Sequence, residues 1–125
     1  MAENGRSGDH RVALGGLGEA AAARAYRGRG FRVLARNWRC PAGELDLVLD
    51  RGSLVVFCEV KTRSGVSLGG AYEAVTPRKQ RKIRQLAELF LAQAGMASQG
   101  VRFDVASVGG SGAGPPRVEI FEDAF

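Results

Sequence analysis

Apolar residues recur at helical spacing in two stretches of the chain. In the first, the spacing predicts a helix over residues 14–26, and the glycines that follow it are stop signals. Its expected buried stripe is Leu14, Leu17, Ala21 and Ala25. In the second, Thr76-Pro77 supplies an N-cap and a first-turn proline, and Gly95 ends the helix. Its expected buried stripe is Ile83, Leu86, Ala87, Phe90 and Ala94.

Five shorter stretches alternate in polarity or are rich in β-branched and aromatic residues, which predicts strands. They cover residues 31–38, 44–49, 54–61, 101–106 and 117–121. Residues 50–53 carry a hairpin turn signal, and the glycine-rich stretches 64–75 and 109–116 are expected to be loops. The resulting order, αβββαββ, predicts an α/β fold in which helices flank one mixed sheet in two or three layers.

Length and composition indicate one soluble domain. The chain has 125 residues, of which 45% are hydrophobic and 25% charged, as is usual for a globular protein. Residues 1–12 show no periodicity and are expected to form a disordered tail, which leaves residues 13–125 as the domain. The N-terminus is polar, and no apolar run approaches the roughly 20 residues of a membrane helix. We therefore expect a cytoplasmic protein with no membrane partner.

Several classes of site lack the residues that they need. His10 is the only histidine and falls in the expected tail, which argues against serine, cysteine and zinc hydrolases. Cys40 and Cys58 match no zinc-binding spacing and make no disulfide framework. Residues 15–18 are rich in glycine, but they follow no strand and precede no P-loop lysine, so nucleotide binding is poorly supported.

Charge is distributed unevenly along the chain, whose net charge is +5. Residues 1–40 carry +5 and residues 76–100 carry +4, whereas residues 41–75 and 101–125 carry −2 each. Basic segments on both sides of an acidic centre suit a protein that holds a polyanion around a metal site. An arginine-rich composition with solvated basic faces gives the same charges, so charge alone leaves nucleic acid as one of two interpretations.

The acidic centre contains a predicted hairpin with several ionisable residues. Glu44 and Asp46 are expected on one face, opposite Leu45, Leu47 and Leu49. On the next strand, Glu59 and Lys61 share a face with Val55 and Phe57. If the turn is Gly52-Ser53, Arg51 pairs with Leu54 and Asp46 lies opposite Glu59. If the turn is Arg51-Gly52, Asp46 is a diagonal neighbour of Glu59.

Facing carboxylates repel each other, and two interpretations of this hairpin account for them. A Mg²⁺ ion held by one or two carboxylates would relieve the repulsion, with the neighbouring lysine assisting phosphate chemistry. Alternatively, the strands present an ordinary polar face on which Lys61 pairs with Glu44.

The hairpin resembles a nuclease signature. Gly43 to Val48 (GELDLV), followed by Glu59-Val60-Lys61, is similar to the PD-(D/E)XK motif. The wider pattern resembles the YraN family of bacterial proteins over about residues 14–125. Its elements are Gly18-Glu19, Arg36-Asn37-Trp38-Arg39, Lys79, Arg102-Phe103-Asp104-Val105 and Asp123-Ala124-Phe125.

The resemblance implies a restriction-endonuclease-like core, similar to archaeal Holliday-junction resolvases. It assigns Asp46 and Glu59 as ligands of Mg²⁺ or Mn²⁺, Lys61 as the residue that assists the nucleophile, and Glu19 as a further catalytic acid. Leu45 replaces the proline of the motif, which only shapes the entry of the strand. Glu44 is an additional acid that is a candidate metal ligand or support. Fold does not settle function.

Basic residues around this site are candidates for binding nucleic acid. Five of them crowd the first turns of the second helix, where positive charge opposes the helix dipole, so phosphate contact is one explanation and a solvated face the other. The candidate nucleic-acid-binding residues are Arg36, Arg39, Arg63, Arg78, Lys79 and Lys82.

Two hypotheses about function follow. One is a metal-dependent endonuclease that hydrolyses phosphodiester bonds, with branched or flapped DNA as its candidate substrate. The other is a catalytically idle nuclease-fold module that binds nucleic acid or a DNA-processing partner. A homodimer is left open, since nucleases that act on branched DNA often need two active sites.

Overall fold

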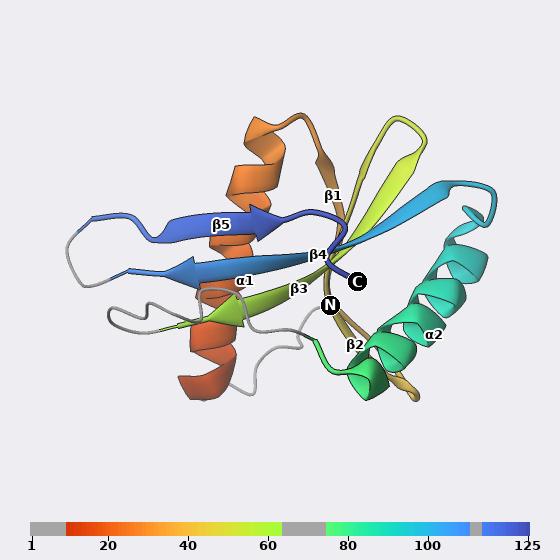
Figure 1. Ribbon diagram of the computed structural model, residues 1–125, viewed down its shortest axis with the longest axis horizontal. Helices are drawn as coiled ribbons and strands as arrows, with labels where there is room; N and C mark the ends of the chain where they lie inside the picture. The colour runs from red at the N-terminus through yellow and green to blue at the C-terminus, as the bar shows by residue number, and fades with distance from the viewer. Residues whose placement is uncertain (1–9, 64–74, 111–113) are drawn as a thin grey trace.

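The computed structural model describes residues 10–63, 75–110 and 114–125, with side chains from residue 16 onward. Residues 1–9, 64–74 and 111–113 lie outside this description; they are parts of the predicted tail (1–12) and of the predicted loops (64–75 and 109–116). The elements along the chain are α1 (His10–Gly28), β1 (Arg32–Cys40), β2 (Gly43–Arg51), β3 (Leu54–Thr62), α2 (Pro77–Ala94), β4 (Gly100–Gly109) and β5 (Arg117–Phe121) (Figure 1).

The five strands form one mixed sheet in the order β1-β2-β3-β4-β5. Strands β1, β2 and β3 are antiparallel neighbours, β3 and β4 are parallel, and β5 is antiparallel to β4. Parallel neighbours need a crossover between them, and α2 lies in that connection. The prediction of a mixed α/β fold with one mixed sheet and two helices is confirmed.

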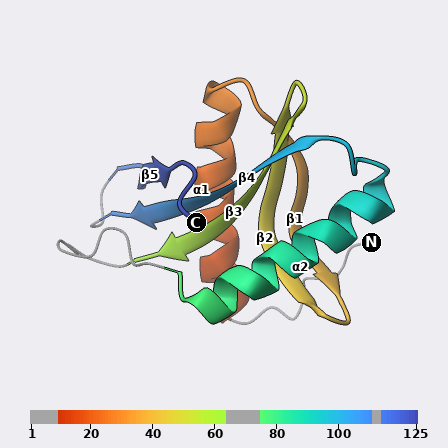
Figure 2. The same cartoon turned by 45° about the vertical axis from the view of Figure 1, so that its right-hand side comes forward.

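The two helices cover opposite faces of the sheet, which gives three layers (Figures 1 and 2). The α1-side core joins α1 to Leu47, Leu49, Val56 and Cys58, whereas the α2-side core joins α2 to Leu45, Val48, Val55 and Phe57. Strands buried on both faces explain the nearly continuous apolar run of β3.

The β2–β3 hairpin turns at Gly52-Ser53. Arg51 pairs with Leu54, and Gly52 has a φ of +63°, a left-handed conformation that glycine adopts without strain. The first of the two predicted turns is therefore confirmed, and the alternative turn at Arg51-Gly52 is wrong. The ladder ends at Leu47 and Cys58, so the pairing of Asp46 with Glu59 predicted for that register is not part of it.

Helix α1 differs from its prediction in both extent and orientation. It begins at His10, four residues before the expected start, so residues 10–12 are helical and not part of a disordered tail. Leu17, expected in the buried stripe, is 67% exposed, whereas Ala22 and Tyr26 are fully buried. The face of α1 that carries small residues packs on the sheet, because small residues let the helix approach it closely. A Cβ at Gly18 would overlap Thr62 Oγ1.

Helix α2 follows its prediction closely. Thr76 Oγ1 accepts a 3.1 Å hydrogen bond from Lys79 N, and Gly95 closes the helix with a φ of 71°. The buried residues are Ile83, Leu86, Ala87, Phe90 and Leu91. Ala94, expected in the stripe, is exposed, and Leu91 is buried in its place.

Candidate functional site

The alternation of β2 breaks at Asp46. Leu45 lies in the α2-side core and Leu47 in the α1-side core, although residues two apart in a regular strand share a face. The prediction that Leu45, Leu47 and Leu49 all face one way is therefore wrong. The side chain between them, Asp46, stands where the strand changes faces.

The neighbouring strand shares this break. Arg36 pairs with Leu47 and Trp38 with Leu45, and the two residues between them, Asn37 and Asp46, form no pair in the ladder. Asn37 has a φ of +52°, a left-handed conformation that asparagine tolerates better than most residues. The irregularity in β1 therefore lets both strands change faces at the same place.

Strands β2 and β3 also part at this point. Their ladder ends at Leu47 and Cys58, and Asp46 Oδ2 accepts a 2.9 Å hydrogen bond from Val60 N beyond it. The Asp46 carboxylate thus satisfies a main-chain donor of β3 that the β2 backbone leaves without a ladder partner. This contact holds Asp46 beside the strand end that carries Glu59 and Lys61.

The Asp46 carboxyl is surrounded by other acids. Burial and then the negative charge of Glu59 raise its pKa to about 7; Glu19 and Glu44 act in the same direction, while the hydrogen bond from Val60 N opposes them. These acids come from α1, β2 and β3. Carboxylates from three elements therefore act electrostatically on Asp46 at the break in the sheet.

Glu19 is buried on the sheet side of α1. It is only 6% exposed, and none of the residues that the structure describes forms a hydrogen bond with its Oε1 atom. Burial raises the pKa of Glu19, whereas a hydrogen bond from Asn37 and the charge of Arg36 lower it. The Glu19 carboxyl therefore lies in a buried environment and not on a solvated face of the helix.

Glu59 faces α2 and has a cation beside it. Its side chain is 16% exposed, and its Oε2 atom lies 3.5 Å from Lys79 Nζ. Lys61 follows two residues later and pairs with Ser107 of β4 in the parallel ladder. The alternation of β3 places Lys61 on the same face as Glu59. The site thus combines two lysines, one from β3 and one from α2.

Glu44 is set apart from this group by its own partner. It is exposed, and its Oε2 atom lies 3.6 Å from Nε of Arg39, its cross-strand neighbour. The alternative in which Glu44 pairs with Lys61 is therefore not what the structure has. Arg39 neutralises Glu44, which leaves Glu44 a supporting position at most.

The other basic candidates differ in what they contact. Arg36 donates from Nη2 to Gly16 O at 3.2 Å, and Lys82 donates from Nζ to Ala42 O at 2.9 Å, so both side chains brace neighbouring elements. Arg63 extends β3 through a 2.8 Å bond from its N to Val108 O. Arg78 is exposed at the start of α2. The structure therefore distributes these residues around the acidic group without gathering them into one patch.

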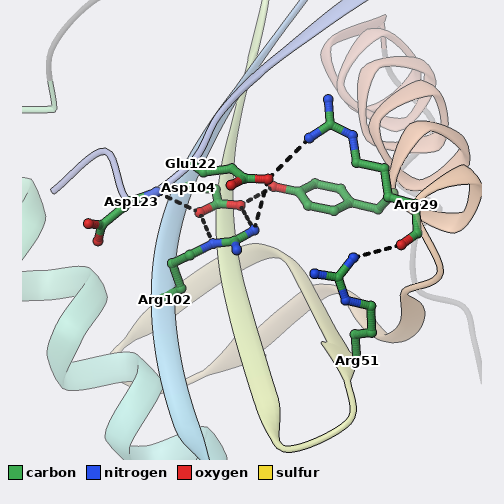
Figure 3. Close-up of polar contacts among 7 residues, drawn as sticks. Arg29, Arg51, Arg102, Asp104, Glu122 and Asp123 are labelled. Carbon is green, nitrogen blue, oxygen red and sulfur yellow. Dashed lines mark hydrogen bonds and ion pairs between the residues drawn. The ribbon is translucent and has the colours of Figure 1, made fainter.

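Two residues of structural importance were not predicted. Asn37 forms the break described above, and an asparagine within a predicted strand is the signal that marks it, because asparagine is depleted in strands. Asp104 is completely buried and accepts hydrogen bonds from Tyr26 OH at 2.7 Å, from Arg102 at 2.9 Å twice and from Asp123 N at 3.0 Å (Figure 3). No local pattern indicates this network, since Tyr26 and Asp123 lie 78 and 19 residues from Asp104 in the sequence.

No three acidic, histidine or cysteine side chains among the described residues are close enough together to hold one metal ion. A site of two carboxylates, which is what Mg²⁺ commonly uses in proteins, is a smaller group.

No helix among the described residues is long and apolar enough to cross a membrane.

Comparison with known proteins identifies the family. Residues 18–108 match the uncharacterised protein family UPF0102. The chain belongs to the UPF0102 family. A UPF0102 protein of Frankia casuarinae is 53% identical over 113 residues, covering 90% of this chain and 96% of the relative. One from Frankia alni is 52% identical over 113 residues, covering 90% and 94%. One from Moorella thermoacetica is 46% identical over 94 residues, covering 75% and 78%.

The matched segment of this UPF0102 protein contains the whole acidic group. It runs from Gly18, the residue that touches β3, to Val108 near the end of β4. Glu19, Asp46 and Glu59 all fall within it. The candidate site therefore lies in the part of the chain by which the family is recognised.

Proposed function

We propose that this UPF0102 protein is a metal-dependent nuclease of the PD-(D/E)XK type with a restriction-endonuclease-like core. One observation carries the proposal: at the break in the sheet, burial and the charges of Glu59 and Glu19 raise the pKa of Asp46, a carboxyl that pairs with no cation among the described residues. The fold alone gains nothing from acids that repel one another in a buried place. A bound cation turns this repulsion into binding energy.

The residues present fit a Mg²⁺ or Mn²⁺ ion. Asp46 and Glu59 supply oxygen ligands from adjacent strands, and two carboxylates are the usual protein share of a Mg²⁺ site. Glu19 adds a buried oxygen atom, Oε1, that has no hydrogen-bond partner among the described residues, and in this proposal it accepts from a metal-bound water. When bound, such an ion makes hydroxide accessible near neutral pH and polarises a phosphate oxygen.

The lysines of the site complete the arrangement for phosphodiester hydrolysis. Lys61 lies on the face of β3 that carries Glu59, where its charge can stabilise a phosphate that gains negative charge. Lys79 holds Glu59 through a 3.5 Å ion pair and is positioned to neutralise this carboxylate before an ion binds. The exposed Arg78 at the start of α2 is a contact for neighbouring phosphates. DNA is the proposed substrate, with branched forms among the candidates.

A cleavage assay tests the proposal. Labelled duplex, flap, fork and four-way junction DNA are incubated with the protein and Mg²⁺ or Mn²⁺. We expect cleavage that Glu59→Ala and Lys61→Ala each reduce by at least about 100-fold, as losses of charge stabilisation do in other enzymes. Glu44→Gln is the matched control, because Glu44 already pairs with Arg39, and it should cleave normally. Cleavage that survives in Glu59→Ala would instead show a contaminating nuclease.

A second candidate function is an idle module that binds nucleic acid or a DNA-processing partner. The ion pair between Lys79 and Glu59 favours it, because a lysine already neutralises one of the two proposed metal ligands. Calorimetry separates the candidates: the nuclease binds Mg²⁺ or Mn²⁺ and loses that binding in Asp46→Asn. No metal binding together with no cleavage on any substrate would establish the idle module.

A further inference from the structure

A pocket of about 240 Å³ lies between α1 and the ends of β3 and β4. Figure 1 shows these strand ends crossing in front of α1. The residues that line the pocket include Leu17, Gly18, Thr62, Arg63, Gly109 and Gly110. The pocket is smaller than the roughly 300–1,000 Å³ of sites that enclose drug-sized ligands, so it has room for a single ring system.

The walls of this pocket suit a flat, uncharged ring. Leu17 at its edge is 67% exposed and offers an apolar surface on which a ring can lie. Gly109 and Gly110 add no side chain to the lining, so this wall is backbone against which a flat ring can lie. None of the lining residues that the structure describes is acidic, so a strand with a phosphate backbone meets no repulsion there.

The pocket adjoins the candidate site through two pairs of sequence neighbours. Gly18 precedes Glu19, and Thr62 follows Lys61. Gly18 and Thr62 touch each other across the α1–β3 contact. Because successive residues of a strand point to opposite faces, Thr62 lies on the α1 side of β3 and Lys61 on the α2 side. The pocket and the acidic group therefore lie on the two faces of one strand end.

We propose that this pocket binds one unstacked base of a nucleic-acid strand that passes the end of β3, next to the phosphate held at Asp46 and Glu59. The inference rests on the proposed function and names its substrate class: DNA with unpaired nucleotides at the cleavage point. A base in a continuous duplex is stacked on both sides and cannot enter a pocket behind the strand. Single-stranded or splayed segments lose the least stacking energy when a base is turned out.

A nucleic-acid base is favoured over other small rings by charge and by position. The net charge of +5 attracts a polyanion rather than a neutral metabolite. The pocket opens one residue from both Glu19 and Lys61, a spacing that suits consecutive groups of one polymer.

Binding in the absence of metal tests the inference, since no cleavage is then required. Fluorescence anisotropy in EDTA compares a 12-nucleotide single strand with a blunt duplex of the same sequence. We expect Leu17→Ala to weaken single-strand binding about fivefold, as lost burial of part of a leucine predicts, and to leave duplex binding unchanged. Leu89→Ala is the matched control: Leu89 is another exposed leucine, 45% exposed, on α2, and its loss should change neither.

A second variant fills the pocket. A Cβ at Gly110 would meet Pro116 Cα at 3.5 Å, an ordinary contact, so Gly110→Val should fold and exclude a base. It should weaken single-strand binding as Leu17→Ala does. A 2-aminopurine in the strand should become more fluorescent on binding to the wild type but not on binding to Gly110→Val.

Two outcomes would overturn the inference in distinguishable ways. If the wild type binds single strands and cleaves DNA, but both pocket variants behave like Leu89→Ala, the pocket holds no base and the proposed nuclease stands. If the wild type binds neither single strand nor duplex at low salt, the proposed function fails and the base pocket fails with it.

Discussion

Two carboxylates inside this protein, Asp104 and Asp46, have opposite surroundings. Asp104 in β4 is fully buried, and its two oxygen atoms accept hydrogen bonds from a tyrosine, an arginine and a backbone N–H (Figure 3). Asp46 in β2 accepts a hydrogen bond from Val60 N, and its charged neighbours are the acids Glu59, Glu19 and Glu44. One acid has a cation beside it, and the other is surrounded by charges of its own sign.

The difference separates a structural acid from a functional one. Asp104 connects three parts of the chain, because its partners Tyr26, Arg102 and Asp123 lie in α1, β4 and the C-terminal segment. The folded state thereby offsets the loss of hydration that burial causes. Among the described residues, Asp46 has only the hydrogen bond from Val60 N to offset its burial and no cation beside it. The same chemical change, Asp to Asn, should therefore have opposite effects at the two positions.

The largest effect is expected for Asp104→Asn. The change leaves the guanidinium of Arg102, 17% exposed, without its bidentate partner. Breaking a buried ion pair costs about 3–5 kcal/mol, and Glu122, 3.6 Å from Arg102, should keep the loss near the lower end, at about 3 kcal/mol. Urea unfolding in metal-free buffer measures it.

Tyr26→Phe serves as the milder control for Asp104. It removes only the hydroxyl that donates to Asp104 and should lower the free energy of unfolding by about 1–2 kcal/mol. If both variants are as stable as the wild type, the network around Asp104 does not hold the fold together.

The second prediction is that Asp46→Asn stabilises the metal-free protein. An asparagine oxygen can still accept from Val60 N, while the repulsion from Glu59 and Glu19 disappears. We expect the free energy of unfolding at pH 8 to rise by about 2 kcal/mol, measured by the same urea titration. In excess Mg²⁺ the order should reverse, because only the wild type gains from the proposed ligand.

The pH dependence of this gain provides a further check on Asp46. Its pKa is about 7 in the folded protein against an ordinary value of 3.8, so between these values the folded state holds a proton that the unfolded chain has released. The wild type should therefore lose stability as the pH rises from about 4 through about 7, and Asp46→Asn should show a flatter profile. A variant that is less stable than the wild type at every pH would make Asp46 a structural acid.

The smallest effect is expected for Glu44→Gln. Glu44 is exposed and pairs with Arg39 across β1 and β2, and surface pairs of this kind contribute about 0–1 kcal/mol. A change below about 0.5 kcal/mol in urea unfolding would agree with a role outside both groups of acids. A loss above about 1 kcal/mol would show that Glu44 belongs to the buried electrostatics of the site.

The amino-acid pattern by itself determined which segments form helices and which form the strands of the sheet. Helix α2 was predictable from its cap at Thr76, its stop at Gly95 and most of its buried stripe, because capping and periodicity are local properties. The Gly52-Ser53 turn was one of two predicted registers, since two-residue hairpins follow turn chemistry. The residues proposed for the site, Asp46, Glu59 and Lys61, were also marked by their spacing.

Only the tertiary structure decided how those residues face one another. The orientation of α1 depends on how closely Gly18 approaches Thr62, and the change of faces at Asp46 depends on a matching irregularity at Asn37 in another strand. Glu19 is buried beside Asn37, which lies 18 residues later in the sequence, and the contact between Lys79 and Glu59 joins elements 20 residues apart. Contacts of this kind are set by packing between elements, which no local spacing encodes, and they are what turn a charged hairpin into a candidate site.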